Sequence, residues 1–486
     1  MNKSLYTFST VIAGSVLLSV TSCQPKEKKT AEKPNIIYIL ADDLGYGDVS
    51  CYGQSHFKTP NIDRLAQMGM KFTRHYAGST VCAPSRSSLM TGMHTGHTPI
   101  RGNKGVEPEG QVPMDSAALT IAEVLKTNGY VTGAFGKWGL GFPGSEGDPN
   151  FQGFDEFFGY NSQTLAHNYY PYHLWHNQTK VMLEENQGHQ TGAYAPNLIH
   201  KKALQFLENN RDTSFFLFYP TIMPHAELVA PEEYMDQYRE KFLPEKTYEG
   251  VDDGPRYRLG PYGSQDECHA AFAAMIKLLD DQVGEIIDKV EELGLSKNTL
   301  IIFTSDNGPH KEGGGDPDYF NSNGPFNGYK RDLYEGGIRE PMIAAWKGHI
   351  NEGSETDHIS AFWDVMPTVC DMIGTEAPMD IDGISFLPTM LGKPQKEHDY
   401  LYWEFHEQGG KQAVLIDNWK GIKFGIQENP DTALVLFDLT TDTGELHNVA
   451  DQHPEMVERM DLIMLEEHHK SDLFPFEYEE VQEPVQ

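Results

Sequence analysis

The amino-acid sequence predicts an α/β fold, in which helices flank a large, mostly parallel central sheet and a small antiparallel sheet with a helix follows it. Three observations predict this fold. Four apolar runs of strand length are each followed by polar residues, one long segment has apolar residues at helical spacing, and short strands replace this pattern after about Pro394. Continuous apolar runs suit strands that are buried on both faces of a parallel sheet. A chain of 486 residues is also too long for one small core.

The four apolar runs comprise residues 35–40, 131–135, 215–219 and 300–304. The polar residues that follow them are Asp42 and Asp43, Lys137, His225, and Asp306 and Asn307. Ligands collect at the carboxyl ends of the strands in such sheets. We therefore expect these polar side chains to meet at one edge of the sheet.

The clearest helix is predicted over residues 270–293. Short strands are predicted at residues 400–405, 412–416, 422–426 and 434–439, followed by a helix from residue 454 towards 469. We therefore expect a large main domain at residues 34–395, which would carry the catalytic site, and a C-terminal subdomain at residues 396–486. Its glutamate-rich end, residues 476–486, is predicted to be a solvated acidic tail.

The first residues are predicted to be an export signal. Lys3 precedes an apolar run over residues 11–20, which ends in Val20-Thr21-Ser22-Cys23 and is too short to span a bilayer. This ending resembles a bacterial lipobox. It predicts a lipoprotein signal peptide at residues 1–22, a lipidated Cys23 that anchors the chain to a membrane, and a tether at residues 23–33. We thus expect a lipid-anchored protein of a bacterial cell envelope, on its periplasmic or outer surface. The alternative is a plain secretory signal.

The formal net charge of −33 argues against a nucleic acid as partner. It does not exclude an anionic ligand, because the Debye length at physiological salt is about 8 Å and the charges that line a cleft outweigh distant surface carboxylates. A site for such a ligand must hold its own cations.

A candidate anion site begins at Cys82, in Cys82-Ala83-Pro84-Ser85-Arg86. We expect Pro84 to open a helix, because proline is favoured at the first position, and the free N–H groups and dipole of that start attract an anion. Arg86 adds a guanidinium that forks to oxyanions. We therefore expect a phosphate or sulfate group beside Cys82. The alternative is a buried, inert cysteine.

The residues after two of the strands indicate a metal site. Asp42, Asp43, Asp306 and Asn307 offer only oxygen ligands, which suit a hard cation such as Ca²⁺, or Mg²⁺ with tighter geometry. The two adjacent carboxylates would repel each other at a strand end without a metal. A lone Asp-Asp pair is more often a solvated turn, but its place at a buried strand end favours the metal site.

Several segments together resemble type I sulfatases, which are members of the alkaline phosphatase superfamily. The segment that begins at Cys82 has the sequence pattern of their signature, C-x-P-S-R-x-x-x-x-T-G. The other matching segments, in family order, are residues 41–48, 59–66, 136–138, 152–155, 304–308, 330–331, 335–337 and 382–385. The resemblance covers nearly the whole chain after the export signal and implies an alkaline-phosphatase-like sandwich fold.

The resemblance also implies roles for particular residues. It implies that a sulfatase-maturating enzyme oxidises Cys82 to formylglycine. The hydrate of this aldehyde, polarised by Arg86 and the metal, would attack the sulfur of a sulfate ester. The metal is usually Ca²⁺, held by the four oxygen-bearing residues and the residue at position 82. Lys137 and Lys330 match lysines that contact the sulfate, and His225 matches a histidine that touches the substrate oxygen. Either His225 or Lys330 would protonate the leaving sugar oxygen.

One position departs from the family pattern. Sulfatases usually read Gly-Lys-Trp-His-Leu-Gly, whereas this chain has Gly139 in place of the histidine that is thought to accept a proton. Glycine cannot act as a base, so His167 and His310 are the candidates for that role. The alternative is that His310 contacts the substrate while His167 is the base, and either residue could instead be a structural loop histidine.

The leading hypothesis is an exported sulfatase that hydrolyses sulfate monoesters of glycans. A bacterial branch that keeps Gly-Lys-Trp-Gly-Leu-Gly resembles this chain, and it is associated with carbohydrates that include galactose and N-acetylgalactosamine sulfated at O4. Two alternatives stay open. One is a phosphodiester or phosphonate monoester hydrolase of the same superfamily, and the other is a non-catalytic glycan-binding lipoprotein.

Overall fold

The computed structural model describes residues 1–7 and 33–480. Residues 1–7 have no regular secondary structure. The lipobox with Cys23, most of the predicted signal peptide and tether, and the last residues of the predicted acidic tail lie outside the described residues. Residues 33–480 belong to one compact unit. None of the described helices is long and apolar enough to cross a membrane.

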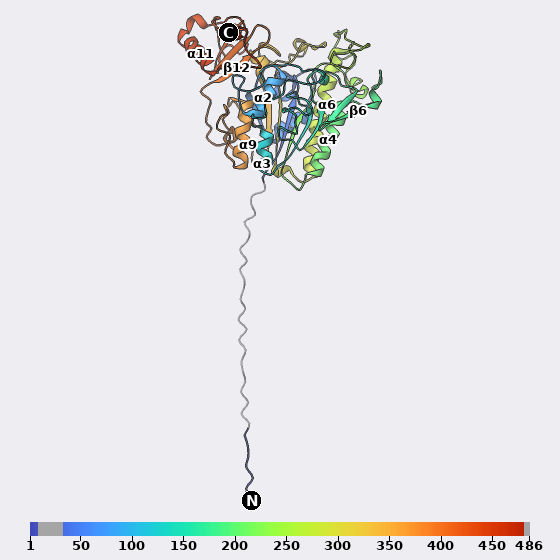
Figure 1. The fold of residues 1–486 in the computed structure, drawn as a ribbon, viewed down its shortest axis with the longest axis vertical. Coiled ribbons are helices and arrows are strands. Elements are labelled where there is room, and N and C mark those ends of the chain that lie inside the picture. The colour runs from blue at the N-terminus through green and yellow to red at the C-terminus, as the bar shows by residue number, and fades with distance from the viewer. Residues whose placement is uncertain (8–32, 481–486) are drawn as a thin grey trace, which may run out of the picture. The chain divides into compact units, whose positions relative to one another are not determined.

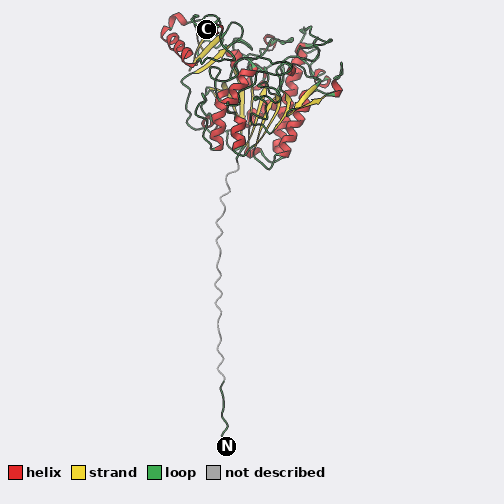
Figure 2. Ribbon diagram, viewed as in Figure 1, coloured by secondary structure: helices red, strands yellow, loops and turns green. Residues whose placement is uncertain are grey.

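The core of this unit is an eleven-stranded sheet (Figures 1 and 2). Its strands run in the order β10-β2-β9-β8-β1-β7-β3-β4-β5-β6, and β11 pairs with β2. The strands are β1 (Asn35–Ala41), β2 (Met70–Tyr76), β3 (Val131–Lys137), β4 (Glu156–Tyr160), β5 (His173–His176), β6 (Thr179–Met182), β7 (Phe215–Pro220), β8 (Thr299–Ser305), β9 (Arg339–Ala345), β10 (Ser354–Thr356) and β11 (Ser360–Ala361). β9 is antiparallel to both β2 and β8, and the β4-β5-β6 edge is antiparallel.

The four predicted apolar runs are β1, β3, β7 and β8, and they lie side by side as β8-β1-β7-β3. All three pairings among them are parallel. Their carboxyl ends therefore share one edge of the sheet. This confirms the predicted fold class, because the central strands of the sheet are parallel. It also places the residues that follow these strands close together.

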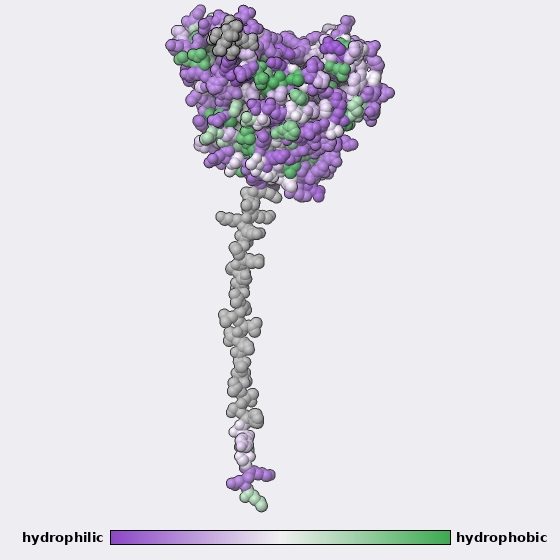
Figure 3. All heavy atoms as spheres, in the orientation of Figure 1, coloured by the Kyte–Doolittle hydropathy of each residue, from purple (hydrophilic) through white to green (hydrophobic). Residues whose placement is uncertain are grey.

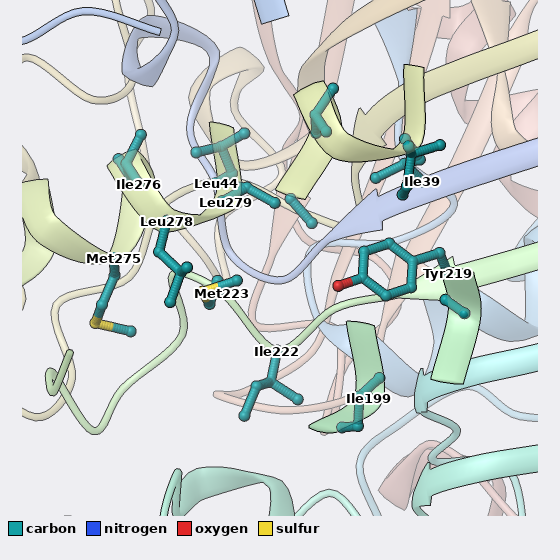
Figure 4. Close-up of a cluster of buried hydrophobic side chains, with 14 of the residues drawn as sticks. Ile39, Leu44, Ile199, Tyr219, Ile222, Met223, Met275, Ile276, Leu278 and Leu279 are labelled. Atoms are coloured by element: carbon teal, nitrogen blue, oxygen red, sulfur yellow. The ribbon is translucent and has the colours of Figure 1, made fainter. Parts of the chain in front are cut away.

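Helices cover both faces of the sheet because β1 is apolar on both sides. Ile37 and Ile39 pack in one cluster with α1 (Pro60–Met68), α4 (Ala195–Asn209) and α6 (Cys268–Glu292), and Figure 4 shows part of it. Ile36 and Tyr38 pack in the other with α2 (Cys82–Thr91), α3 (Ile121–Thr127) and α9 (Val365–Ile373). Five one-turn helices lie in the connections, namely α5 (Glu232–Met235), α7 (Pro317–Phe320), α8 (Glu335–Ile338), α10 (Leu387–Met390) and α12 (Glu477–Glu480).

A second sheet follows, with the antiparallel order β12-β13-β14-β15. Its strands are β12 (Leu401–Phe405), β13 (Lys411–Ile416), β14 (Trp419–Phe424) and β15 (Val435–Asp438), and α11 (Pro454–Glu467) packs on one face. The other face packs on residues of the main sheet region, including Tyr76 and Trp363. The small antiparallel sheet with its helix was predicted from the sequence.

The predicted solvated tail is wrong at its start. Phe476 is fully buried, and its ring stacks on His406 with ring centroids 4.1 Å apart. An aromatic ring of this size is stabilised by burial even when acidic residues follow it. The face of the molecule seen in Figure 3 is mainly hydrophilic, with scattered apolar residues.

Candidate active site

The polar residues that follow the four central strands meet at one edge of the sheet. Asp42 and Asp43 directly follow β1, and Asp306 and Asn307 directly follow β8, which is paired with β1. Asp43 has a positive φ of 63°, and its backbone N–H donates to Asp306 Oδ1 at 3.1 Å. This turn fixes both aspartates against the end of β8, and all four residues are fully buried.

Helix α2 brings Cys82 to the same place. The helix begins at Cys82 itself, after the extended residue Val81, so the prediction that Pro84 opens the helix is wrong by two positions. The first N–H groups of a helix have no intrahelical partner, so a proline is tolerated in the third position as well. Ser85 Oγ donates to the carbonyl oxygen of Asp306 at 2.6 Å and ties the helix to the end of β8.

Cys82 is buried, forms no disulfide and is a protonated thiol. Its Sγ donates to Asp42 Oδ1 at 3.2 Å. Burial, together with the carboxylates of Asp306 and Asp42, raises the pKa of the Cys82 thiol well above its usual value. The thiolate is the nucleophilic form of cysteine. The unmodified side chain is therefore held as a thiol, which cannot supply a strong nucleophile at this site.

Arg86 lies one turn further along α2 and is also buried. Its Nε and Nη2 donate to Asp306 Oδ2 at 3.0 and 2.8 Å, and Nη1 donates to the carbonyl oxygen of Lys137. The guanidinium thus joins the ends of β8 and β3. Burial and repulsion from Asp42 nevertheless raise the pKa of Asp306 to about 6, against the attraction of Arg86.

Two buried lysines balance the two adjacent aspartates. Lys137 Nζ donates to Asp42 Oδ2 at 2.7 Å, and Lys330 Nζ donates to Asp43 Oδ2 at 2.9 Å. Burial would raise the pKa of Asp42, but the charges of Lys137 and Arg86 outweigh it and the pKa is lowered. Both carboxylates are therefore ionised at neutral pH, with a cation on either side.

The donor set fits a hard cation. Asp42, Asp43, Cys82 and His225 offer ligand atoms within 4.8 Å of one another. Asn307 Nδ2 donates to Asp43 Oδ1 at 2.7 Å, while the buried Asn307 Oδ1 has no hydrogen-bond partner among residues 33–480. Carboxylates and a buried carboxamide oxygen without a partner are the kind of oxygen donors that Ca²⁺ and Mg²⁺ bind, and a bound cation would relieve the repulsion between Asp306 and Asp42.

His225 lies beside both Lys330 and the carboxylate of Asp43. Its Nδ1 donates to the carbonyl oxygen of Ala226 at 2.5 Å, so Nε2 is the acceptor and lies 3.1 Å from Lys330 Nζ. Burial and the charge of Lys330 lower the pKa of His225 to about 3. The imidazole is therefore neutral at neutral pH, and Lys330 is the group that carries a proton.

The two candidates for the missing base both flank His225. The ring of His167 stacks on His225 with ring centroids 5.1 Å apart, and the ring of His310 also stacks on His225, with ring centroids 5.5 Å apart. His310 Nε2 lies 3.3 Å from the carbonyl oxygen of Pro224, and its Nδ1 contacts the backbone of Glu312. His167 Nδ1 donates to the carbonyl oxygen of Gly260 at 2.8 Å, and the described residues include no hydrogen-bond partner for its Nε2.

Sequence reasoning missed three residues of this cluster. Glu312 Oε2 accepts from Lys330 Nζ at 3.1 Å and from the Tyr262 hydroxyl at 3.2 Å, and its Oε1 accepts from Arg331. Glu312 lies two positions after His310, and Arg331 lies one position after Lys330. Proximity in sequence was therefore an available signal for both. Tyr262 comes from a long loop and carried none.

The comparisons agree with this geometry. Residues 34–375 match the family model described as sulfatase, and residues 324–470 match that of the C-terminal part of N-sulphoglucosamine sulphohydrolase. The chain is 29% identical to an N-acetylgalactosamine-6-O-sulfatase of Bacteroides thetaiotaomicron, over 91% of this chain and 95% of that protein. It is 30% identical to arylsulfatase A of Homo sapiens, over 90% and 88%. The crystal structure of Ps i-CgsB superposes with a TM-score of 0.76 at 27% identity, covering 93% and 96%.

The fold and the family match define a type I sulfatase of the alkaline phosphatase superfamily. The chain belongs to the sulfatase family, since the family model covers most of it. The protein is thus a sulfuric ester hydrolase.

Proposed function

We propose that this protein hydrolyses sulfate monoesters of carbohydrates through a formylglycine made from Cys82. One observation carries the proposal. Cys82, Arg86, Lys137 and Lys330 converge with the carboxylates on the carboxyl ends of β1 and β8, so the site of a chain with a negative net charge holds three buried cations of its own. Such a cluster binds a sulfate group and stabilises the charge that develops on it during transfer.

The state of Cys82 supports the modification. A thiol whose pKa is raised by burial and by two carboxylates is a poor nucleophile. Formylglycine, once formed by a maturating enzyme, supplies a hydrated aldehyde as the attacking oxygen group. Asp42 Oδ1, which accepts from Cys82 Sγ at 3.2 Å, is placed to accept a proton from a group at position 82.

Asp42, Asp43, Asp306 and Asn307 would hold the divalent cation, which we propose to be Ca²⁺ in preference to Mg²⁺. The cation would supply positive charge beside a sulfate oxygen and the residue at position 82. Arg86 keeps Asp306 in position through two hydrogen bonds, and Lys137 does the same for Asp42. These contacts orient the ligand carboxylates before any substrate binds.

Lys330 is the proposed proton donor to the leaving sugar oxygen. It carries the proton that the neutral His225 lacks, and Glu312 and Asp43 hold its ammonium group in place. His225 orients that ammonium through Nε2. Of the two donors that the sequence left open, we therefore propose Lys330 and not His225.

His167 is the proposed base in place of the histidine that position 139 lacks. Its Nδ1 is committed to the carbonyl oxygen of Gly260, which leaves the lone pair of Nε2 able to accept a proton. Both nitrogens of His310 contact backbone atoms, so we propose that His310 supports His225 by stacking on its ring.

The substrate is proposed to be a sulfated galactose or N-acetylgalactosamine unit. The sequence suggested sulfate at O4, and the relative from Bacteroides thetaiotaomicron is named for sulfate at O6 of N-acetylgalactosamine. The structure of Ps i-CgsB was also solved in complex with k-i-k-neocarrahexaose. We propose the O4 ester first and the O6 ester as the second candidate.

The same proposal includes the location. The lipobox that ends at Cys23 supports an exported protein anchored by a lipid to the bacterial cell envelope, where sulfated glycans and a maturating enzyme would be its partners. Replacing Cys23 by alanine should move the protein from the membrane fraction to the soluble fraction.

Sulfate release from paired substrates tests the function. Matured protein is incubated with galactose and N-acetylgalactosamine that carry sulfate at O4 or O6, with an aryl sulfate, and with an aryl phosphodiester and a phosphonate monoester. We expect release from a sulfated sugar to exceed the two phosphorus reactions. Faster phosphorus hydrolysis would favour a phosphodiester or phosphonate hydrolase, and glycan binding without any release would favour a binding protein.

A further inference from the structure

A glutamine side chain occupies the space beside Gly139. A Cβ atom built on Gly139 would lie only 2.1 Å from Gln163 Nε2, and Gly139 has a φ of +77°. The carboxamide of Gln163 therefore lies directly against the backbone of the segment that follows Lys137. No larger side chain fits at position 139 unless Gln163 moves.

This carboxamide is buried and has an unused donor. Gln163 is 6% exposed, and its Nε2 has no hydrogen-bond partner among residues 33–480. Buried polar side-chain atoms are nearly always hydrogen-bonded, and leaving one unpaired is costly. Asn161, two residues earlier, is fully buried and also has both amide atoms unpaired within the described chain.

The contacts of the surrounding segment place Gln163 beside the segment that carries Lys137. The backbone N–H groups of Trp138 and Gly139 donate to the carbonyl oxygens of Tyr160 and Asn161 at 2.9 and 3.0 Å, so the chain before Gln163 runs alongside Lys137. Four residues after Gln163, His167 stacks on His225. Burial and then the charges of Lys137 and Lys330 lower the pKa of His167 to about 4, so both lysines are near this segment.

We propose that Gln163 contacts the substrate, by donating a hydrogen bond from Nε2 to an oxygen of the sulfuryl group on the side where Lys137 lies. This inference rests on the proposed function and deepens it. A primary amide is a neutral donor with no proton to lose between pH 4 and 10, so Gln163 supplies a fixed dipole beside the charged groups.

Gln163→Leu tests the contact, because it keeps a side chain at this position that is one atom shorter than glutamine and removes the donor. We expect kcat to fall by about tenfold to a hundredfold, the range for a lost donor to a charged group, on both a sulfated sugar and an aryl sulfate. The shape of the pH profile should stay that of the wild type, because no titrating group is removed. Gln163→Glu places negative charge at the same point and should lose at least as much.

Gln152→Leu is the matched control. Gln152 is buried, donates through Nε2 to the carbonyl oxygen of Glu146 at 2.9 Å, and has an unpaired Oε1 among the described residues, but it makes no contact with the cluster around Cys82. This variant should lower the melting temperature with kcat and KM close to wild type. Gln163→Asn, which is shorter and keeps the amide, is the second variant if Gln163→Leu does not fold.

A binding measurement separates this inference from the proposed function. Inorganic sulfate should raise the melting temperature of the wild type and of Gln152→Leu, and the rise should be at least halved in Gln163→Leu. Wild-type kcat and KM in Gln163→Leu on both substrates, or an unchanged sulfate-induced shift, would overturn the inference. A loss confined to the sugar substrate would also overturn it, because the donor would then contact the sugar. If the wild type releases no sulfate, the proposed function fails, and the sulfate-induced shift still tests the Gln163 contact.

Discussion

Replacing Lys137 by methionine should remove activity and stability together. The ammonium of Lys137 is buried and lies 2.7 Å from Asp42 Oδ2. At an effective dielectric constant of about 20, this separation corresponds to an attraction of about 6 kcal/mol, which desolvation of both groups offsets in part. Removing one partner of a buried pair leaves the other charge uncompensated, and we expect the free energy of unfolding to fall by about 3–5 kcal/mol.

The loss of activity should be separable from the loss of stability. Removing one preorganised donor from the site of charge development lowers kcat by about 10²–10³-fold. The assay measures sulfate release per folded molecule, with unfolding in urea followed in parallel. A variant that unfolds more easily but keeps its kcat would refute the role of Lys137 in the reaction.

Lys420→Met is the control for this experiment. Lys420 is equally buried and pairs with the buried Glu335 at 2.9 Å, on strand β14 of the small sheet. It should lose a similar free energy of unfolding while kcat stays within about twofold, because the pair supplies no charge to the sulfate site. Equal losses of kcat in both variants would mean that the activity of Lys137→Met is lost through general destabilisation.

Three further sets of variants test other parts of the structure. His167→Ala should lower kcat by about tenfold or more, whereas His310→Ala should act mainly on stability, measured by sulfate release and thermal unfolding. Asn307→Ala should weaken Ca²⁺ binding measured by calorimetry, since Asn307 Oδ1 is an unpaired buried atom that we propose as a ligand. Chelation of the metal should lower the melting temperature of the wild type and change that of the variant less. Burial lowers the pKa of His75 to about 3 from an ordinary 6.5, so the neutral form stabilises the fold and this stability is lost as pH falls below 6.5. His75→Asn should therefore lose about 1 kcal/mol less than wild type between pH 7.5 and 5.5 in urea titrations.

The sequence predicted the strands that carry the site because their signal is local. β1, β3, β7 and β8 are continuous apolar runs, and the rule that ligands gather at the carboxyl ends of parallel strands placed their polar followers together. The start of α2 was predicted two residues late, because proline fits several positions in the first turn. The burial of Phe476 depends on a ring, His406, that is distant in sequence.

The loops around the site could not be predicted in the same way. The contact between Gly139 and Gln163 and the stack of His167 on His225 join segments whose relative path is set by loop conformation. Side chains in loops have no periodicity to detect, which is why Gln163 and Tyr262 were missed, whereas the position of Glu312 two residues after His310 was an available signal. The order of candidates for the missing base also depended on backbone contacts of His167 and His310 that no spacing encodes.

The mass of the peptide that contains residue 82, from protein purified out of its native host, tests the central claim most directly. The buried and protonated Cys82 thiol is expected to have been converted, so an aldehyde or its hydrate should be found at that position. An unmodified cysteine in every molecule would leave the site without its nucleophile and would contradict a formylglycine-dependent carbohydrate sulfatase.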